Sequence, residues 1–409
     1  MRDRFTFSSR WIRIPLLNLL IVSFLGIILR YKIAFSLPLI QQKNLLHGHS
    51  HFAFTGWVTQ VLMYLLIRQL KQNTIFKIER KYKWILFANL FAAFGMLISF
   101  PIEGYGPFSI LFSTLSIFVS YAFAVKYWKD LNKESEHPIA YFWFKAAVFF
   151  NAFSSLGAFG LAFLLIHKII MQQWSLAAVY FFLHFQYNGW FFFGCGGLLM
   201  SVIEKKIYNR NFLKRVFLLF LVTCIPCYFL SVLWLPLPLP IYLLIALAAF
   251  LQLLAWLLLA NRLIKYRNQF FEIPLFSKRL FVLSAVAISF KLILQLISTI
   301  PALSQMAFGF RPIVIGYLHL VLLGVITIFI LSYISAFEIQ NIKSDFKTGI
   351  SIFVAGIIVN ELLLMLQGIA DLAYIRLPFI NEMLLIAAII LFTGLLIMNW
   401  ALAPKQTRQ

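Results

Sequence analysis

Residues 47–67 read HGHSHFAFTGWVTQVLMYLLI and contain no lysine, arginine, aspartate or glutamate. A segment of this length and composition crosses the ~30 Å hydrocarbon core of a bilayer when it forms an α-helix. Three histidines, His47, His49 and His51, stand at its start. Ionisable side chains are costly within a membrane and commonly mark a functional site. The segment therefore predicts a transmembrane helix with a functional group near one membrane face.

The composition of the whole chain extends this prediction. Of the 409 residues, 62% are hydrophobic and only 12% are charged, and the mean hydropathy is +0.90. Soluble domains carry about 25% charged residues. The alternation typical of strands is absent, which disfavours a β-barrel. We therefore expect an all-α integral membrane protein in contact with membrane lipid.

Apolar segments of helical length fill nearly the whole sequence and are separated by turns rich in proline or glycine. No soluble domain fits between them and no internal repeat is evident, so we predict a single transmembrane domain over residues 1–409. The twelve expected spans are approximately 14–36, 47–68, 83–101, 107–127, 140–167, 174–203, 213–235, 239–261, 279–300, 312–338, 347–370 and 380–402.

The formal net charge of +22 would suggest nucleic-acid binding in a soluble protein. Here most of the 35 Lys and Arg residues fall in alternate loops, the bias expected of cytoplasmic loops. We therefore expect no nucleic-acid partner, both termini in the cytoplasm and a bacterial inner (plasma) membrane as the location. The first span follows the basic N-terminus without a cleavage site, so no cleavable signal peptide is expected. The Lys and Arg residues on the opposite side are Arg30, Lys32, Lys43, Lys168, Arg311 and Arg376.

With this orientation, His51 and His319 lie at similar depths in the outer third of the bilayer. Neutral imidazole is a good ligand for heme iron, copper and zinc. Two such rings from different helices can hold a heme b between them, which makes His51 and His319 candidate axial ligands. Arg311 and Arg376 are candidates to bind the heme propionates at the outer face.

His47 shares a helix face with His51 because the two are four residues apart, whereas His49 points elsewhere. His47 is a candidate ligand for a second metal or a propionate. The alternative is that His47 and His49 are interfacial residues wetted by headgroup water. Which of the three histidines is the metal ligand stays open.

His184 lies near mid-membrane in the sixth span, with Tyr187 and Asn188 one turn later. His184 and Tyr187 are candidates for catalysis, for binding copper or oxygen, or for a proton-carrying water chain. The alternative is a hydrogen-bond cluster between helices. Cys224 and Cys227 form a C-x-x-C pair, for which packing is favoured over a copper or redox role.

Lys291 in the ninth span and Glu361 in the eleventh both reach the middle of the membrane. An unpaired charge there costs at least ~2.5–3.5 kcal/mol on insertion scales. One interpretation is a proton path from the inner side, and the other is a buried ion pair that fixes helix register. The sequence leaves both open.

Twelve spans with a histidine in the second, sixth and tenth resemble subunit I of the heme–copper oxidases, including the nitric-oxide-reductase branch, and the NnrS-type heme and copper membrane proteins. His51, followed by FAFTGW, is similar to the second-span ligand of the low-spin heme, and His319 in GYLHLVLLG is similar to the tenth-span ligand. His184 with Tyr187 is similar to the family's copper-ligating His and Tyr, with a spacing of three residues instead of four. The resemblance implies heme b, copper and an oxidoreductase related to cytochrome c or quinol oxidase.

Two departures from the oxidase pattern stand out. The seventh span has no histidine, whereas the family carries a His-His pair there that completes the copper site. Tyr317 occupies the position of the family's high-spin heme ligand. We therefore do not expect a conventional oxygen-reducing centre.

These observations lead to an expected function in electron transport or in handling a small gas such as oxygen or nitric oxide. No C-x-x-C-H heme attachment motif is present, so electrons would come from a quinol or from another redox protein. The rival hypothesis is a secondary transporter whose outer, periplasmic-side histidines collect a metal ion. A third hypothesis is a non-catalytic sensor or assembly factor that binds heme.

Overall fold

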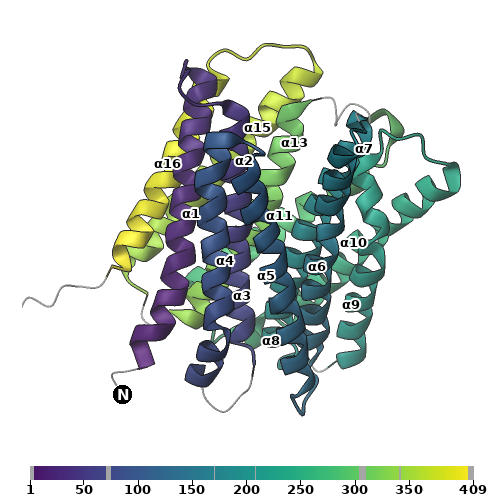
Figure 1. The fold of residues 1–409 in the computed structure, drawn as a ribbon. Coiled ribbons are helices and arrows are strands. Elements are labelled where there is room, and N and C mark those ends of the chain that lie inside the picture. Colours follow the sequence, from purple (N-terminus) through teal and green to yellow (C-terminus); the bar gives the residue numbers. More distant parts are fainter. Residues whose placement is uncertain are drawn as a thin grey trace, which may run out of the picture. The chain divides into compact units, whose positions relative to one another are not determined.

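The structure is a computed structural model that describes residues 4–70, 75–169, 171–207, 209–303, 310–339 and 342–403. Within these ranges every regular element is a helix. The chain divides into two compact units, Met1–Ala122 with Phe337–Gln409 (unit 1) and Phe123–Ala336 (unit 2). The main helices are α1 (Arg4–Ala34), α2 (Gln42–Phe52), α3 (Gln60–Ile67), α4 (Ile75–Glu103), α5 (Pro107–Asn132), α6 (Ile139–Ile166), α7 (Gln172–His184), α8 (Phe192–Ile203), α9 (Arg210–Cys224), α10 (Leu239–Lys265), α11 (Leu275–Ile297), α13 (Arg311–His319), α14 (Ile328–Tyr333), α15 (Ser344–Leu372) and α16 (Ile380–Ala401) (Figure 1).

The described residues contain ten helices that are long and apolar enough to cross a membrane, or eleven if one bent pair counts as a single span. Gln172–Ile203, the run that holds the predicted sixth span, is helical but is not among the ten. Its polar side chains, including His184 and Gln186, lower its hydropathy. The protein is therefore a multi-pass helical membrane protein.

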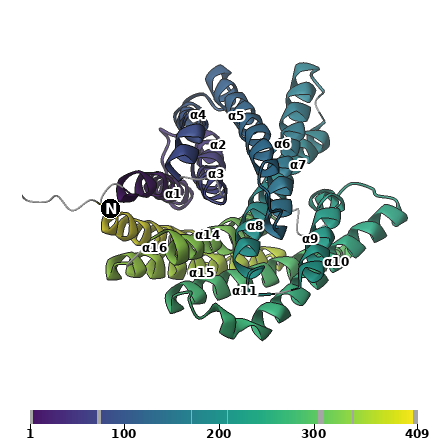
Figure 2. The same cartoon turned by 90° about the horizontal axis from the view of Figure 1, so that it is seen from below.

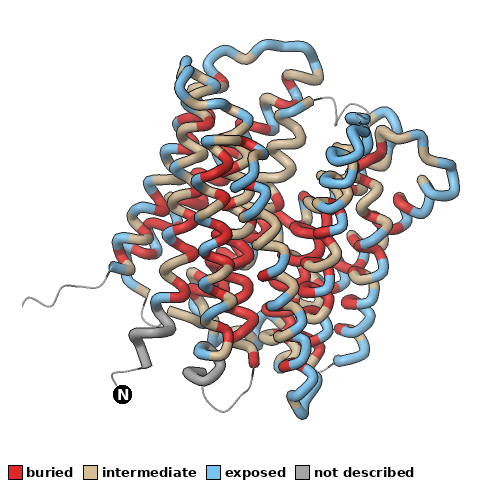
Figure 3. Tube along the Cα trace, viewed as in Figure 1, coloured by how far each residue is buried: buried red, intermediate tan, exposed pale blue. Residues whose placement is uncertain are grey.

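Large apolar side chains such as Trp84, Phe91 and Trp400 are exposed on the outside of the helices. In water such side chains would be unfavourable, but lipid contacts them at no cost. By contrast, every residue of α3 is buried. Figure 3 shows the same division, with buried stretches on the inner sides of helices and exposed ones outside.

In unit 1, α15 packs closely on α16, and α1 lies along α16 (Figure 1). The close approach depends on glycine, because a Cβ atom added at Gly349 would lie 2.5 Å from the backbone nitrogen of Met398. At the end of the pair, Lys343 Nζ donates to the carbonyl of Ala401 at 2.9 Å. Asn399 Nδ2 donates to Leu16 O at 3.2 Å and so joins α16 to α1.

In unit 2, α6 packs along α7 and α8 (Figure 2). Small residues again permit the approach, since a Cβ atom at Gly157 would lie 2.5 Å from the carbonyl oxygen of Ala178. Further along, Gly196 and Gly197 leave room for the rings of Trp143 and Phe144. The tight α6–α7–α8 layer fixes the position of the polar residues in the sixth predicted span.

The predicted seventh span is not one continuous helix. α9 ends at Cys224, and a 3₁₀-helix, η3 (Pro226–Val232), follows at an angle of 42°. Proline has no N–H to donate and its ring clashes with the preceding turn, so it breaks the α-helical ladder. The N–H of Tyr228 donates to Ile225 O at 3.1 Å, a tighter bond than the α-helical one to Cys224. Tyr228 N–H, which would bond to the Cys224 carbonyl in a continuous α-helix, is therefore turned to Ile225.

Candidate functional site

Three runs of helix change from α-helix to π-helix at a histidine or one residue after it, and a fourth changes after Tyr333, at η6 (Ile334–Glu338). His51 is the penultimate residue of α2, which is followed by η1 (Ala53–Thr59). His184 ends α7, which is followed by η2 (Phe185–Phe191), and His319 ends α13, which is followed by η5 (Leu320–Thr327). These helices are the second, sixth and tenth of the predicted spans. π-Helices are rare, and they occur frequently at functional sites.

Polar side chains from neighbouring helices hold the backbone of two of these π-helical segments. Asn18 Nδ2 donates to Gly56 O at 2.6 Å, and Asn89 Nδ2 donates to Thr55 O at 3.0 Å, both within η1. In unit 2, Ser284 Oγ donates to Val325 O of η5 at 2.8 Å. These bonds supply buried carbonyls with donors outside the regular helical ladder.

The third segment, η2, is held by a weaker contact. The thiol of Cys224 donates to Asn188 O over 3.8 Å. Sulfur is a poor donor, so this bond adds less than the amide and hydroxyl bonds at η1 and η5. The three π-helical segments that follow a histidine, η1, η2 and η5, thus each have a carbonyl bonded from a neighbouring helix.

The ring of His319 is held by its own helix. His319 Nδ1 lies 2.8 Å from Ile315 O, and a carbonyl only accepts, so Nδ1 carries the proton. In the neutral ring, the lone pair is then on Nε2. Metal-binding histidines commonly donate their other N–H to a carbonyl in this way. No residue of α13 is buried, so this stretch of helix leaves a half-exposed face around His319.

His51 and His47 lie in unit 1 beside two aromatic residues. The ring of His51 stacks on Phe100, with centroids 4.3 Å apart and planes at 12°. The Tyr105 hydroxyl is 3.5 Å from His51 Nε2, and the His47 ring meets Tyr105 edge-on at 4.7 Å. His47 Nε2 is buried without a hydrogen-bond partner. The two histidines thus share Tyr105 as a neighbour.

His49 turns to α1. Its Nδ1 donates to Val22 O at 3.1 Å, and its Cε1 would lie 3.7 Å from a Cβ atom at Gly26. This contact fixes α2 against α1. The bond to Val22 assigns His49 a packing role in unit 1, in keeping with the sequence expectation that His49 points away from His47 and His51.

Both ring nitrogens of His184 are hydrogen-bonded. Nε2 donates at 2.9 Å to the carbonyl of Cys224, the last residue of α9 before the break at Pro226. Nδ1 accepts from Asn188 Nδ2 at 3.1 Å. A metal ion at His184 would have to replace one of these bonds. The geometry is that of the alternative raised from the sequence, a hydrogen-bond cluster between helices.

The Tyr187 ring lies beside that of His184, with centroids 6.2 Å apart, but it does not hydrogen-bond to it. Its hydroxyl instead forms a hydrogen bond with Ser231 of η3. The Tyr187 ring also meets that of Tyr317 at 6.5 Å. The tyrosine that stands in place of the family's high-spin heme ligand is therefore next to Tyr187.

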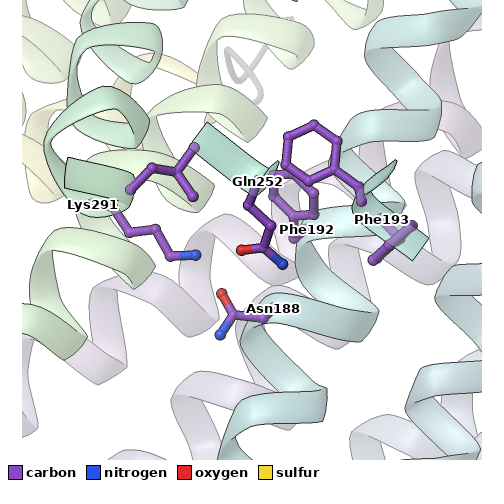
Figure 4. Close-up of a pocket in the computed structure, with 7 residues that line it drawn as sticks. Asn188, Phe192, Phe193, Gln252 and Lys291 are labelled. Carbon is purple, nitrogen blue, oxygen red and sulfur yellow. The ribbon is translucent and has the colours of Figure 1, made fainter. Parts of the chain in front are cut away.

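Lys291 reaches the same polar cluster from α11. The side chain is only 6% exposed, and Figure 4 shows its nitrogen turned toward the side-chain oxygens of Asn188 and Gln252. Gln252 Oε1 also accepts from Gln295 Nε2 at 2.9 Å. Phe192, Phe193 and Phe220 enclose a cavity of about 10 Å³ beside these groups, which is room for about one water molecule.

Lys291 forms no ion pair with a carboxylate in the described part of unit 2. Glu361 belongs to unit 1, where Asn360 Nδ2 donates to its Oε1 at 3.2 Å. The pairing of Lys291 with Glu361 therefore stays a prediction, as does the proton path. Within unit 2, Asn188 bonds to His184 and lines the same cavity as Lys291.

Arg311 and Arg376, the candidates for propionate binding, are both exposed. Arg311 begins α13 in unit 2, and Arg376 lies between α15 and α16 in unit 1. Among the described residues, no group of three or more His, Cys, Asp or Glu side chains is arranged to hold a metal ion. Two histidines, however, suffice as axial ligands of heme iron.

The sequence did not single out Asn18, Ser284 or Gln252 as parts of these sites. Each is a polar residue within an apolar span, which is the signal that could have identified them. Compared with family models and with curated proteins, the sequence matches none.

Proposed function

We propose that the protein is a twelve-span, heme-binding protein of a bacterial inner membrane, with both termini in the cytoplasm, that acts in electron transport or in binding oxygen or nitric oxide. One observation carries the proposal, namely that the histidines of the second, sixth and tenth spans all stand at an α-to-π junction. Imidazole at such a site suits heme iron, which supplies one-electron chemistry and gas binding.

His319 is the ligand that the local geometry supports best. The bond from Nδ1 to Ile315 O fixes the tautomer and the orientation of the ring, and so presents Nε2 as the ligand atom. The second axial ligand expected from the sequence is His51. Arg311 and Arg376 are proposed to bind the propionates, and copper near His184 is retained only as a secondary candidate. A quinol or another redox protein would supply electrons.

The test is a reduced-minus-oxidised visible spectrum of the purified protein after expression with ample heme. The wild-type protein should show a Soret and an α band of a b-type heme. His319→Ala and His51→Ala should each remove or shift the bands. His167→Ala is the matched control, because this exposed histidine bonds only to Phe163 of its own helix turn.

No heme band in the wild-type protein would overturn the proposal. Bands that survive in both ligand variants would overturn the ligand assignment while leaving heme binding intact. Bands lost equally in His167→Ala would show that the loss reflects general misfolding.

The second candidate is a secondary transporter, and the broken helix favours it. Transporters bind substrates near mid-membrane where helices are discontinuous. The break between α9 and η3 lies beside the cluster of His184, Asn188 and Lys291. Uptake of a divalent metal into proteoliposomes by a protein without a chromophore would support this candidate over the heme protein.

A further inference from the structure

Three helix ends in unit 2 surround an open cavity of about 550 Å³. They are the N-terminus of α6, the C-terminus of α8 and the N-terminus of α9. The apolar part of the wall comes from Ile139, Ile207 and Leu213. The charged part comes from Glu136, Glu204 and Arg210.

Glu204 is built into the wall as a cap of α6. Its carboxylate accepts the N–H of Ile139 at 2.7 Å and also that of Ala140. Partial burial raises the pKa of Glu204 above its usual value, and the two N–H bonds only partly offset this effect. A fixed carboxylate at a membrane surface is a good acceptor for a primary ammonium group.

Arg210 provides the opposite charge. One guanidinium nitrogen, Nη2, donates to His137 O at 2.7 Å and thereby anchors the side chain at the rim. A guanidinium has five N–H donors in all, and it matches the geometry of a phosphate. The same cavity therefore offers a phosphate-binding group and carboxylates together.

The cavity lies at the ends of the predicted spans 140–167, 174–203 and 213–235, which the expected topology places at a membrane surface. Four basic residues are close in sequence to the residues that line it, namely Lys205, Lys206, Lys214 and Arg215. Such basic clusters are typical of segments at a layer of lipid headgroups. A purely anionic headgroup would meet the carboxylates of Glu136 and Glu204. A choline headgroup has no N–H to donate to them.

We propose that this cavity binds the headgroup of a zwitterionic phospholipid with a primary ammonium group, that is, a phosphatidylethanolamine. The phosphate binds Arg210, and the ammonium group binds Glu136 and Glu204. Ile139, Ile207 and Leu213, which are nearly fully buried, form the floor of the cavity beneath the headgroup. The lipid site does not depend on heme binding, so the lipid proposal and the heme proposal are tested independently.

The experiment uses the full-length protein in phosphatidylcholine nanodiscs doped with phosphatidylethanolamine or with phosphatidylglycerol, and measures retained lipid by native mass spectrometry. The wild-type protein should retain phosphatidylethanolamine in preference to both other lipids. Arg210→Ala and Glu136→Gln should each weaken this retention by about tenfold, the effect of losing one charged hydrogen bond. Arg267→Ala, an exposed arginine outside the cavity, is the matched control and should behave as wild type.

Equal retention of all three lipids by the wild-type protein would overturn the proposal. Preference for phosphatidylglycerol would show a phosphate site without an ammonium site, and would overturn it too. Glu204→Gln keeps an acceptor for the cap of α6, so this variant tests the second carboxylate without unfolding the helix end. Retention unchanged in Arg210→Ala and Glu136→Gln, with folding verified by circular dichroism, would also contradict the assignment.

Discussion

His184 is held by one bond that it donates and one that it accepts, and both partners are backbone or amide groups of unit 2. Backbone carbonyls are also bonded by side chains elsewhere. Carbonyls of π-helical segments accept hydrogen bonds from the side chains of Asn18, Asn89 and Ser284. A buried polar group left without a partner costs about 1–3 kcal/mol. At the scale of single residues, the polar groups in these apolar helices therefore stabilise backbone that is not α-helical.

The His184→Leu variant tests this role. The substitution leaves both the Cys224 carbonyl and the Asn188 amide without their partner, so we expect a loss of about 2–4 kcal/mol in the free energy of unfolding. The measurement is thermal unfolding in detergent. His167→Leu serves as the control. Wild-type stability together with a lost chromophore would instead indicate that His184 is a ligand.

The carboxyl group of Glu204 should make stability depend on pH. Burial raises its pKa in the folded state, so folding favours the protonated form. The resulting stabilisation is present at acid pH and is lost as the pH rises from about 4.5, the ordinary pKa, through the raised value. Thermal unfolding measured across this range should show a slope in the wild-type protein that Glu204→Gln reduces. If stability depended on pH in the same way in the wild-type protein and in Glu204→Gln, the pH dependence could not be assigned to Glu204.

At the scale of the element, α2, α7 and α13 share one design, in which an α-helix runs to a histidine and continues as a π-helix. A π-helical turn contains one residue more than an α-helical turn, so the side chains that follow are rotated about the helix axis. Carbonyls in such a turn are also accessible to donors from other helices. By contrast, α15 and α16 are regular α-helices, and glycine lets their backbones come into contact. The π-helical segments and this helix pair are tested by separate predictions.

Asn18→Leu should destabilise unit 1 by about 1–3 kcal/mol, because Gly56 O loses its donor. If the bond also holds η1 in its π-helical form, the substitution should shift the spectrum of the heme that we propose to bind at His51. Asn399→Leu, which removes a bond to Leu16 O away from η1, is the control. A spectrum altered to the same degree by both variants would argue against a specific effect on η1.

Gly349→Ala should separate α15 from α16, because the added Cβ atom would lie 2.5 Å from Met398 N. We expect a loss of about 1–3 kcal/mol from overpacking. Gly160→Ala is the control, since its Cβ would meet nothing nearer than 3.9 Å and alanine favours the helix. Equal stability of the two variants, measured by thermal unfolding, would contradict this account of the pair.

At the scale of the whole molecule, hydropathy predicted where the helices lie. Each of the twelve expected ranges falls on a helix or on a run of helical segments. The π-helical turns were not foreseen, because they depend on donors such as Asn89 and Ser284 that come from other helices. Pro226 was visible in the sequence, but the capture of the Cys224 carbonyl by His184 depends on how two helices pack.

The distribution of Lys and Arg makes a prediction for the whole chain. Reporter fusions that are active only in the periplasm should be active after Lys168 and inactive after Ile207, and a cytoplasmic fluorescent reporter should show the reverse. The Lys and Arg residues of these loops determine the predicted orientation of every span. If the two reporters gave the reverse result, the histidines predicted on the outer side would lie on the cytoplasmic side. Identical reporter activity at both sites would contradict the twelve-span topology.

The break at Pro226 makes the chemistry of an imidazole depend on the backbone of another helix. With alanine at this position, Tyr228 N–H could return to Cys224 O, and the ring of His184 would have to share this acceptor. The donating nitrogen of that ring, Nε2, carries the ring proton, so it could bind a metal ion only after the proton moves to Nδ1 or leaves the ring. A single proline thus influences which tautomer an imidazole on another helix adopts.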